Sequence, residues 1–410
     1  MAKPTIRFKG FDDEWEQRKF GEIVEKYEDP IETPTEGYTR LGIRSHAKGT
    51  FHSYVEKGKE LETAKMFRVA ADKFIVNITF GWEHAVAITD ENDAGKLVSH
   101  RFPQYSFNAG MNPNFFRYLI LDENFKHHLE LSSPGGAGRN RVLKLSDMLE
   151  YKMNFPSEAE QKKIAAYFDD LDNLITLHQR KCDETKKLKK YMLQKMFPQN
   201  GSKVPEIRFK GFTDEWEQRK FGEITELKSA SRVHKDEWTS NGVPFYRSSD
   251  VMAAINGTEN EKAFISEELY EKLSKVSGKL EEGDILVTGG GSVGNPYIVP
   301  DNKPLYTKDA DLLWIKNKGK FHPYFLYEFF FSPTFRNYLG SISHVGTIAH
   351  YTITQLSDTP ICLPSFDEQK EVGEYFQSLD NLITLHQHKC EELKKLKKFM
   401  LQNMFTQKNK

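Results

Sequence analysis

The chain contains almost the same 18 residues twice, and this repeat constrains the fold more than any other feature. Residues 6–23 read IRFKGFDDEWEQRKFGEI, and residues 207–224 read IRFKGFTDEWEQRKFGEI. Seventeen of the 18 positions agree, and the exception is Asp12 against Thr213. Solenoid repeats return every ~20–50 residues, which is far closer than the spacing of these two copies. Two copies at this distance indicate two half-molecules in tandem on one chain.

A second repeat closes each half. Residues 155–200 and residues 363–408 agree at 30 of 46 positions, including the run LDNLITLHQ. Between the opening and closing repeats lie residues 24–154 and residues 225–362, which show little likeness to each other. Each half therefore has a constant opening, a variable middle and a constant ending. We divide the chain into a first domain at 1–154, a long helix at 155–200, a second domain at 201–362 and a second long helix at 363–410.

The closing repeats predict two long amphipathic helices. Ser157 and Ser365 each follow a proline and have a glutamate three residues further on, which is the pattern of a capping box. Apolar residues then recur in steps of three and four, so helices are expected at 157–197 and 365–405, each about 60 Å long. Both are acidic in the first half and basic in the second, which favours an antiparallel coiled coil. The seam is expected to hold Leu171, Ile175, His178, Cys182, Leu379, Ile383, His386 and Cys390.

The variable middles are predicted to be mixed α/β. Short β-type runs in the first are KFIVNI, HAVAIT and KLVSHRFPQYSF, and those in the second are GDILVTG, YIVP and LYTKDADLLWIK. Each set is followed by an aromatic-rich helical stretch, NPNFFRYLILDENFKHHLEL or FHPYFLYEFFFSPTFRNYL. The same element order with different residues predicts an α/β (α+β) fold class: two mixed domains, two long antiparallel helices and a pseudo-two-fold tandem repeat.

Bulk properties narrow the class of protein. A chain of 410 residues is long enough for two or three domains. The net charge of −1 gives no overall attraction to nucleic acid, so an anionic partner would be held by local basic patches. Three cysteines without a pairing framework indicate a reducing compartment, and no apolar run approaches the roughly 18 residues of a membrane helix. We expect a cytoplasmic protein that does not span a membrane.

Two motifs invite catalytic interpretations. Gly289, Gly291 and Gly294 in TGGGSVG match G-x-G-x-x-G, but a strand follows them instead of the helix that a dinucleotide site requires. A tight β-turn is therefore favoured. NPNF at residues 112–115 is similar to the NPP-aromatic motif of amino-methyltransferases, but the second proline is missing. We interpret Pro113 as a first-turn helix proline.

Two further patterns have alternative explanations. Pairs at i and i+4 fall in the expected seam, His178 with Cys182 and His386 with Cys390. They could ligate a metal, but core packing is favoured because no carboxylate is evident behind them. The two KKLKK runs could contact phosphate or a partner protein, although a solvated face is the more common role. No P-loop, H-E-x-x-H, G-x-S-x-G or paired-carboxylate signature appears, so we expect no catalytic residue, no metal and no enzyme activity.

The layout of the chain also carries a resemblance to a known family. Each half opens with RFKGF-x-DEWEQRKFGEI and closes with FPSEAEQKKIAAYFDDLDNLI or LPSFDEQKEVGEYFQSLDNLI, around a variable α/β middle. This arrangement resembles the specificity subunit of type I restriction-modification enzymes, over essentially the whole chain. One departure is that GWEHA in the first half lacks the glycines of TGGGSVG in the second.

The resemblance implies a function and a set of partners. The variable middles would be target-recognition domains, each binding one half of a split sequence in double-stranded DNA. The long helices would separate them and dock two methyltransferase subunits, and restriction/translocase subunits would complete the complex. S-adenosylmethionine is then expected in the methyltransferase subunits, ATP and Mg²⁺ are expected in partner subunits, and no cofactor is expected in this chain.

The residues that would contact DNA are expected on polar loops, because base edges are recognised by hydrogen-bonding side chains. Loops in equivalent positions of the two halves carry different polar sets, as two recognition surfaces for different half-sites would require. The candidates are Arg44, Ser45, His46, Lys48, Arg139, Asn140 and Arg141 in the first half, and Arg247, Ser248, Ser249, Ser292, Asn295, His344, His350 and Tyr351 in the second.

Two other functions are compatible with parts of this pattern. A scaffold that presents two protein- or ligand-binding modules would use the same tandem layout, but its binding would not depend on salt. A free-standing methyltransferase would need cofactor and catalytic motifs that the sequence lacks.

Overall fold

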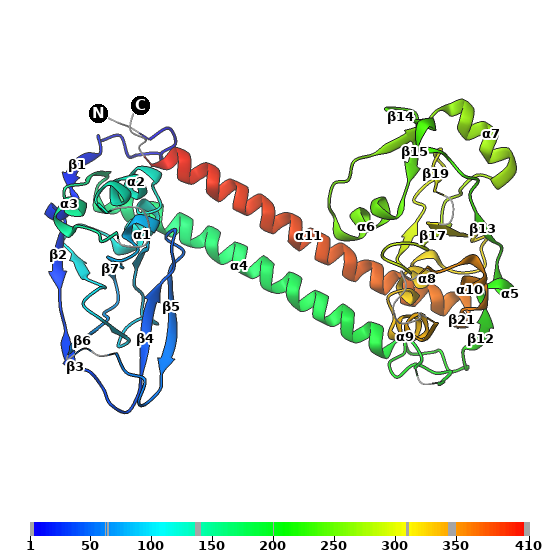
Figure 1. The fold of residues 1–410 in the computed structure, drawn as a ribbon, viewed down its shortest axis with the longest axis horizontal. Helices are drawn as coiled ribbons and strands as arrows, with labels where there is room; N and C mark the ends of the chain where they lie inside the picture. The colour runs from blue at the N-terminus through cyan, green and yellow to red at the C-terminus, as the bar shows by residue number, and fades with distance from the viewer. Residues whose placement is uncertain are drawn as a thin grey trace. The chain divides into compact units, whose positions relative to one another are not determined.

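The chain folds into two compact units, each with its own sheets and core (Figure 1). Unit 1 comprises Met1–Leu177 with Lys389–Lys410, and unit 2 comprises His178–His388, so each unit takes one part of each long helix. The structure is a computed structural model that describes residues 4–61, 63, 65–135, 141–199, 201–308, 311–342 and 350–405.

Unit 1 contains two sheets and a two-stranded ribbon (Figure 1). The antiparallel sheet β2-β10-β7-β8 consists of Val24–Tyr27, Gln104–Phe107, Lys73–Val76 and Val86–Ile88. The sheet β3-β6-β9-β4-β5 consists of Pro30–Glu32, Lys65–Arg68, Leu97–Val98, Tyr38–Ile43 and Thr50–Val55, with β4 and β9 parallel. The ribbon pairs β1 (Glu16–Lys19) with β11 (Lys152–Phe155). The short helices are η1 (Phe20–Glu22), η2 (Gly81–Glu83), α1 (Pro113–Leu119), α2 (Glu123–Leu131) and α3 (Leu145–Leu149).

Unit 2 repeats this plan. Its antiparallel sheet β13-β20-β17-β18 consists of Leu227–Ser229, Leu312–Ile315, Ile285–Thr288 and Pro296–Ile298. The sheet β14-β16-β15-β19 consists of Trp238–Thr239, Ala263–Ile265, Val243–Tyr246 and Tyr306–Thr307, with β15 and β19 parallel. The ribbon pairs β12 (Glu217–Lys220) with β21 (Pro360–Leu363). The short helices are α5 (Phe221–Ile224), η3 (Lys235–Glu237), α6 (Ser248–Asn256), α7 (Glu267–Ser277), α8 (Pro323–Phe329), α9 (Pro333–Ile342) and α10 (Ile353–Asp358).

The two variable middles therefore share one topology. In both four-stranded antiparallel sheets the chain enters at an edge, and the last strand lies between the first and the hairpin of the second and third. The other sheet of each unit contains a parallel strand pair, β4 with β9 in unit 1 and β15 with β19 in unit 2. In both units the second strand of this pair comes just before the last strand of the antiparallel sheet. The prediction of one mixed α/β fold written twice is confirmed, although the two middles share little sequence.

The constant opening and ending of each half pair with each other, which explains why both are repeated. β1 runs antiparallel to β11 with Glu16 opposite Phe155, and β12 runs antiparallel to β21 with Glu217 opposite Leu363. The tryptophan just before each of these opening strands is buried in the core of its unit. The repeated opening and ending thus form the same two-stranded ribbon beside each variable domain.

Two details of the element prediction are wrong. KLVSHRFPQYSF and LYTKDADLLWIK each contain two strands that belong to different sheets, β9 with β10 and β19 with β20. Each aromatic-rich helix is also two helices, α1 with α2 and α8 with α9. In each pair a residue that starts a new helix separates the two helices. Asp122 caps α2 by accepting from the Asn124 N–H, and Pro333 begins α9 after the buried Ser332. Pro113 does occupy the first turn of α1, where Asn112 caps the helix, as predicted.

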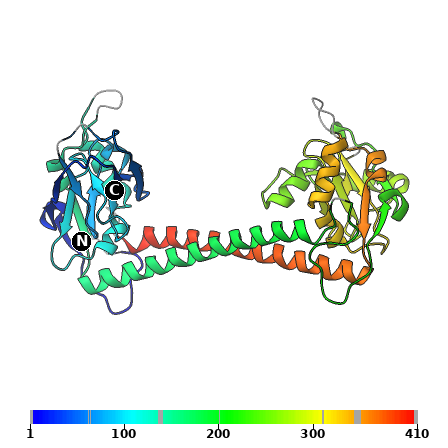
Figure 2. The ribbon, with the colours of Figure 1, turned by 90° about the horizontal axis from the view of Figure 1, so that it is seen from below.

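The long helices are α4 (Glu158–Lys195) and α11 (Phe366–Met404), which lie side by side (Figure 2). Within unit 1, Lys397 Nζ contacts Asp172 Oδ1 at 2.6 Å. Within unit 2, His178 Nδ1 lies 3.0 Å from His386 Nδ1 and Lys189 Nζ lies 2.6 Å from Asp380 Oδ2. Partners on α11 have lower numbers as those on α4 rise, so the helices are antiparallel in each unit, as predicted.

The eight residues expected in the seam separate into two groups. Leu171, Cys182, Leu379 and Cys390 are buried. Ile175, His178, Ile383 and His386 are partly exposed and lie near the middle of each helix. The Cys182 thiol faces the carbonyl of Ile383 and the Cys390 thiol faces the carbonyl of Ile175, each at 4.0 Å. Both thiols therefore pack as small core groups against backbone.

Lys189 interrupts the apolar stripe of α4 because it bridges the carboxyl groups of two acidic residues. Its ammonium contacts Glu328 Oε1 at 2.7 Å as well as Asp380, and the Glu328 side chain is fully buried on α8. Burial raises the pKa of Glu328 to about 8, against the attraction of Lys189. In unit 1 the equivalent lysine, Lys397, lies over the ring of Tyr118, whose hydroxyl donates to Asp169 and Asp172.

The raised pKa of Glu328 predicts a pH dependence of stability. The folded state keeps a proton that the unfolded carboxyl releases near pH 4.3, so the unfolding free energy should fall as the pH rises from about 4.5 to about 8. Relative to Glu328→Gln, wild-type protein should lose stability with a slope approaching about 1.4 kcal/mol per pH unit in that window. Urea unfolding at several pH values measures this slope.

A matched control separates this effect from general charge removal. Glu371 is exposed on α11, and Glu371→Gln should not change the pH profile of unfolding. Parallel profiles for wild type and Glu328→Gln across pH 5–8 would contradict the prediction.

Candidate nucleic-acid interface

The first candidate loop joins β4 to β5 and is held by the neighbouring loop. The backbone N–H groups of His46 and Ala47 donate to the carbonyls of Glu83 and His84, both at 2.8 Å. These bonds fix His46 and Ala47 at φ 62° and 48°, in the left-handed region. Ser45 Oγ also donates to Glu83 Oε2 at 2.5 Å. The turn from 44 to 49 is therefore fixed by tertiary contacts that leave His46 exposed.

The basic residues of this turn differ in whether their side chains contact the rest of the protein. The Arg44 guanidinium lies 5.3 Å from the centroid of the Phe51 ring and donates to the carbonyl of Thr50. Arg44 is exposed but folded back on its own hairpin, whereas His46 and Lys48 are exposed at the tip. His46 and Lys48 are thus the members of the predicted set best placed to reach a ligand.

The β7–β8 loop forms the second wall of the unit 1 site. It contains η2 and ends at His84, which adopts φ 61° and ψ 41°. The buried His84 ring donates from Nε2 to the carbonyl of Ile120, at 2.8 Å, at the end of α1. Burial lowers the pKa of His84 to about 4, so the ring is neutral at pH 7 and anchors the loop as an uncharged donor.

The third segment of the unit 1 site precedes α3. The Arg141 guanidinium lies 5.5 Å from the centroid of the Trp82 ring on η2, and 3.9 Å from Glu130. Leu143 continues this contact because its N–H donates to the carbonyl of Ile78. The structure thus brings Arg141 to the same loop that holds the 44–49 turn. Arg139 and Asn140 lie outside the described residues.

In unit 2 the corresponding turn leads into α6. Arg247 donates to Asp250 through Nε at 2.9 Å and to the carbonyl of Glu261, with its guanidinium 5.5 Å from the Trp238 ring centroid. In this conformation the guanidinium of Arg247 donates to groups of the protein itself, so the structure does not support the predicted contact between Arg247 and DNA. The adjacent serines differ: Ser248 is half-buried and Ser249 is exposed.

The β17–β18 loop is a hairpin connection, as predicted for TGGGSVG. The Gly294 N–H donates to the Thr288 carbonyl at 2.7 Å, and no helix begins between β17 and β18. Ser292 is exposed at the tip. Asn295 is half-buried, and its Nδ2 donates to the Ser292 carbonyl at 2.7 Å. A dinucleotide site at this position is excluded, since the backbone N–H groups of a helix are missing.

The last candidate segment of unit 2 precedes α10. His344 lies outside the described residues, and His350 is exposed. Tyr351 is only 1% exposed, and its hydroxyl shares a hydrogen bond with Thr359. The prediction of Tyr351 as a DNA contact is therefore wrong, because its ring fills the core beside Phe335. Sequence alone could not separate an exposed tyrosine from a buried one in this loop.

Two of these unit 2 segments are hydrogen-bonded to one backbone group, the carbonyl of Asp311. The Asp311 carbonyl accepts hydrogen bonds from Ser248 Oγ at 3.0 Å and from the Gly289 N–H at 2.8 Å. The Tyr351 N–H donates to the Gly289 carbonyl at 2.8 Å, which places His350 beside the glycine run. The end of β15, the β17–β18 loop and the segment before α10 therefore form one surface.

The same three positions of the fold build the candidate surface in both units. Each surface combines the loop after the strand that pairs in parallel, the hairpin loop of the antiparallel sheet and the segment before the last short helix. Unit 1 presents basic and aromatic groups there, and unit 2 presents serine, asparagine and histidine. Sequence analysis did not single out Trp82 and Glu83 in unit 1 or Asp311 in unit 2, which contact the candidate segments. The signal that points to Trp82 and Glu83 is that GWEHA takes the place of the glycine run.

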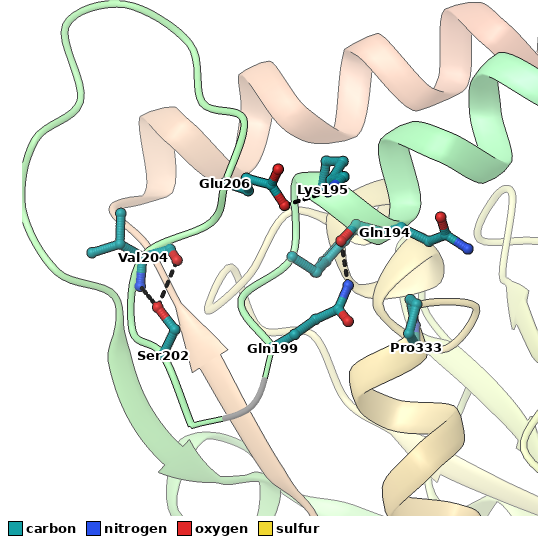
Figure 3. Close-up of a pocket in the computed structure, with 8 residues that line it drawn as sticks. Gln194, Lys195, Gln199, Ser202, Val204, Glu206 and Pro333 are labelled. Carbon is teal, nitrogen blue, oxygen red and sulfur yellow. Dashed lines mark hydrogen bonds and ion pairs between the residues drawn. The ribbon is translucent and has the colours of Figure 1, made fainter.

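A pocket of about 510 Å³ lies elsewhere in unit 2, at the end of α4 (Figure 3). It is formed by the segment that joins the two halves, where Lys195 Nζ pairs with Glu206 Oε2 at 2.5 Å and Gln199 donates to the Gln194 carbonyl. Its walls are Gln194, Lys195, Phe197, Gln199, Ser202, Val204, Glu206 and Pro333, which include no candidate loop residue.

Other kinds of site find no support in the part of the chain that the structure describes. No group of three or more histidine, cysteine, aspartate or glutamate side chains is arranged there to hold a metal ion. Among the same residues, no helix combines the length and the apolar character needed to cross a membrane.

Comparison with known proteins identifies the family. The family model described as the type I restriction modification DNA specificity domain matches residues 12–187 and, again, residues 213–395. The chain belongs to this family. The two matches contain the two variable domains with most of the long helices, so the tandem repeat is a repeat of the specificity domain. Specificity subunits are the non-catalytic subunits of their complexes, and this chain is of that kind.

Named relatives agree over much of their length. The type I restriction enzyme MjaVIII specificity subunit of Methanocaldococcus jannaschii is 27% identical over 305 residues, covering 71% of this chain and 69% of the relative. The putative MjaX specificity subunit of the same organism is 23% identical over 97% of this chain and 94% of the relative.

A solved structure supports the fold. The type I restriction-modification system S subunit from M. genitalium aligns with a TM-score of 0.58 at 14% identity, over 99% of this chain and 100% of that one. At this identity the likeness concerns the fold alone. It matches the two-domain, long-helix architecture described above.

Proposed function

We propose that this chain selects the DNA target of a type I restriction-modification complex, with each unit recognising one half of a bipartite sequence. The observation that carries the proposal is that one topology presents two different polar surfaces at the same three positions of the fold. A single duplicated function with unchanged specificity would have kept the loops alike. Here the constant segments are kept and the loops differ.

The chemistry of each surface suits base recognition. In unit 1, His46 and Lys48 are exposed on the turn that the β7–β8 loop holds, and Arg141 packs on Trp82 of that same loop, so the surface combines cationic and hydrogen-bonding groups. Lysine and arginine favour guanine, and basic groups also favour phosphate. In unit 2, Ser249, Ser292 and His350 offer hydrogen bonds to base edges with little charge. We propose these exposed side chains as the contacts, with Ser45, Ser248 and Asn295 supporting the loops.

We also propose that the long helices dock the methyltransferase subunits. Large apolar side chains are exposed at matching positions of the two helices. These are Leu174 with Leu382, Leu188 with Leu396, and Tyr191 with Phe399. Single exposed apolar residues are common on proteins, but the same three positions in both repeats indicate a function. Two equivalent surfaces fit two copies of one partner.

Cofactor chemistry is assigned to the partners. S-adenosylmethionine would be bound by the methyltransferase subunits, and ATP with Mg²⁺ by partner subunits of the complex. This chain would supply sequence recognition and the docking surface only.

Methylome sequencing tests the proposed function. This chain and the methyltransferase subunit of its own system are produced together in a host without adenine methylation. The expected result is methylated adenine in a motif of two short specific parts, separated by a fixed number of unspecified bases. A contiguous motif, or no methylation by an intact complex, would overturn the proposal.

Docking is tested by copurification in the same strain. Leu188→Glu with Leu396→Glu should lower the affinity for the methyltransferase about tenfold or more, since charges would be placed in an apolar contact. Val276→Glu is the matched control, because Val276 is 79% exposed on α7, outside the helix pair. Equal copurification of both variants would exclude these helix positions from the interface.

A further inference from the structure

The β17–β18 loop is closed by an internal network of hydrogen bonds. Thr288 Oγ1 donates to the Ser292 carbonyl and accepts from the Asn295 N–H at 2.9 Å. Gly291 and Gly294 adopt φ 72° and 76°, which most other residues adopt only with strain. These bonds define the turn itself. They do not hold it in place against the rest of the domain.

The start of the loop, at Gly289, is bonded to Asp311 and Tyr351, and its later part is attached by an arginine on α9. Arg336 Nη2 donates to Asn295 Oδ1 at 3.0 Å, and its Nη1 donates to the Val293 carbonyl at 3.3 Å. The guanidinium lies 5.5 and 5.7 Å from the ring centroids of Phe331 and Phe335. Arg336 thus joins two points of the loop to a rigid helix and is itself fixed between two aromatic rings.

The environment of Arg336 is unusual for a structural arginine. Burial lowers its pKa, and among the described residues its hydrogen-bond partners include no carboxylate. Its polar partners there are two neutral oxygens of the loop. Glycine at 294 allows close packing, because a Cβ there would lie 2.8 Å from Leu339 and 2.9 Å from Phe335. The loop is therefore held against α9 from two directions.

Unit 1 attaches its equivalent loop by different residues. There the anchor is His84, on the loop itself, which donates to the Ile120 carbonyl between α1 and α2. Its ring also packs against Phe125 of α2, with centroids 6.1 Å apart. Both units thus fix the hairpin loop of the antiparallel sheet on the helix pair that follows it. Two independent chemical solutions at one place in the fold indicate that the loop position matters for function.

We propose that Arg336 is a positioning residue for sequence recognition by unit 2, which holds the Ser292–Asn295 segment in the single conformation that discriminates between bases. The proposal rests on the proposed function of the chain. Discrimination by hydrogen bonds requires donors and acceptors within a fraction of an ångström of their places, and a mobile loop would bind several sequences about equally. Arg336 need not touch DNA to have this effect.

The test uses the methyltransferase complex with Arg336→Met and Arg336→Lys. Binding is measured to the duplex that carries the wild-type target, and to duplexes changed in either half-site. Arg336→Met should lower the preference for the correct unit 2 half-site roughly tenfold or more, the range of one bidentate base contact. The preference for the unit 1 half-site should stay unchanged. Arg336→Lys should fall between, because an ammonium cannot bridge both loop oxygens in the same fork.

A second variant distinguishes a displaced loop from a protein that has lost its fold. Gly294→Ala leaves Arg336 intact and displaces the loop from α9 through its Cβ, so it should relax the same base positions. An equal loss of affinity for every duplex, with preferences unchanged, would overturn the positioning role. If the wild-type complex shows no preferred target at all, the proposed function fails, and that outcome is distinct from an Arg336 variant that keeps the wild-type preference.

Discussion

Replacing Arg208 with alanine should lower the free energy of unfolding of unit 2 by about 3–5 kcal/mol. Arg208 pairs with Glu368 in a two-pronged contact, Nε to Oε1 at 2.6 Å and Nη2 to Oε2 at 2.7 Å. The glutamate is 1% exposed and also accepts from Trp216 Nε1 at 3.3 Å. Without the arginine, a carboxylate would stay buried with no opposite charge, which accounts for the large cost.

The effect should be confined to one unit. Arg7 and Glu160 form the same pair in unit 1, at 2.7 Å, so Arg208→Ala should leave unit 1 intact. Hydrogen–deuterium exchange measures this directly, because β12 should lose protection while β1 keeps it. Arg7→Ala should produce the reciprocal pattern.

Two further variants identify the cause. Arg219 forms an exposed pair with Glu217 in the same repeat, and Arg219→Ala should cost less than about 1 kcal/mol. Combining Arg208→Met with Glu368→Leu should recover most of the stability, because no buried charge remains. If Arg208→Ala lowers the free energy of unfolding as little as Arg219→Ala does, the pair of Arg208 with Glu368 does not stabilise the contact between the opening repeat and the long helix.

The sequence predicted those parts of the fold that depend on local pattern. The repeats and the helical period identified the long helices, but they did not identify the contact between Lys189 and Glu328. Glu328 lies on α8, 139 residues further along the chain, and only tertiary structure brings them together. Other local signals were overlooked, such as Ser266, which caps α7 by accepting from the Leu269 N–H.

The candidate surface was harder to predict because residue type does not determine direction. Equivalent positions in the two halves selected loops that the structure brings together in each unit, and their contact with DNA stays a prediction. The side chains within them could not be ranked, since Arg44 and Arg247 make intramolecular contacts that depend on Phe51 and Trp238. Tyr351 was misplaced for the same reason: its burial is decided by residues distant in sequence.

The largest functional change is expected from exchanging a whole variable domain. Replacing residues 24–154 with the first variable segment of another family member should change one half of the methylated motif completely and leave the other half unaltered. The physical reason is that the candidate loops of each unit are built and anchored within that unit. Methylome sequencing of the host shows both halves at once.

The structure adds conditions that such an exchange must meet. The distal junction falls inside β11, where Asn154 is opposite Gln17, so the donor segment must supply the first three residues of that strand in register. The donor must also fit the long helices where Tyr118 donates to Asp169 and Asp172. A tyrosine at that position should give a folded chimera, whereas a large apolar residue would leave the two carboxylates without this donor. Exchange of residues 225–362 is the matched experiment and should change only the other half. If either chimera folds, docks its methyltransferase and alters both halves of the motif, recognition is not divided between the units.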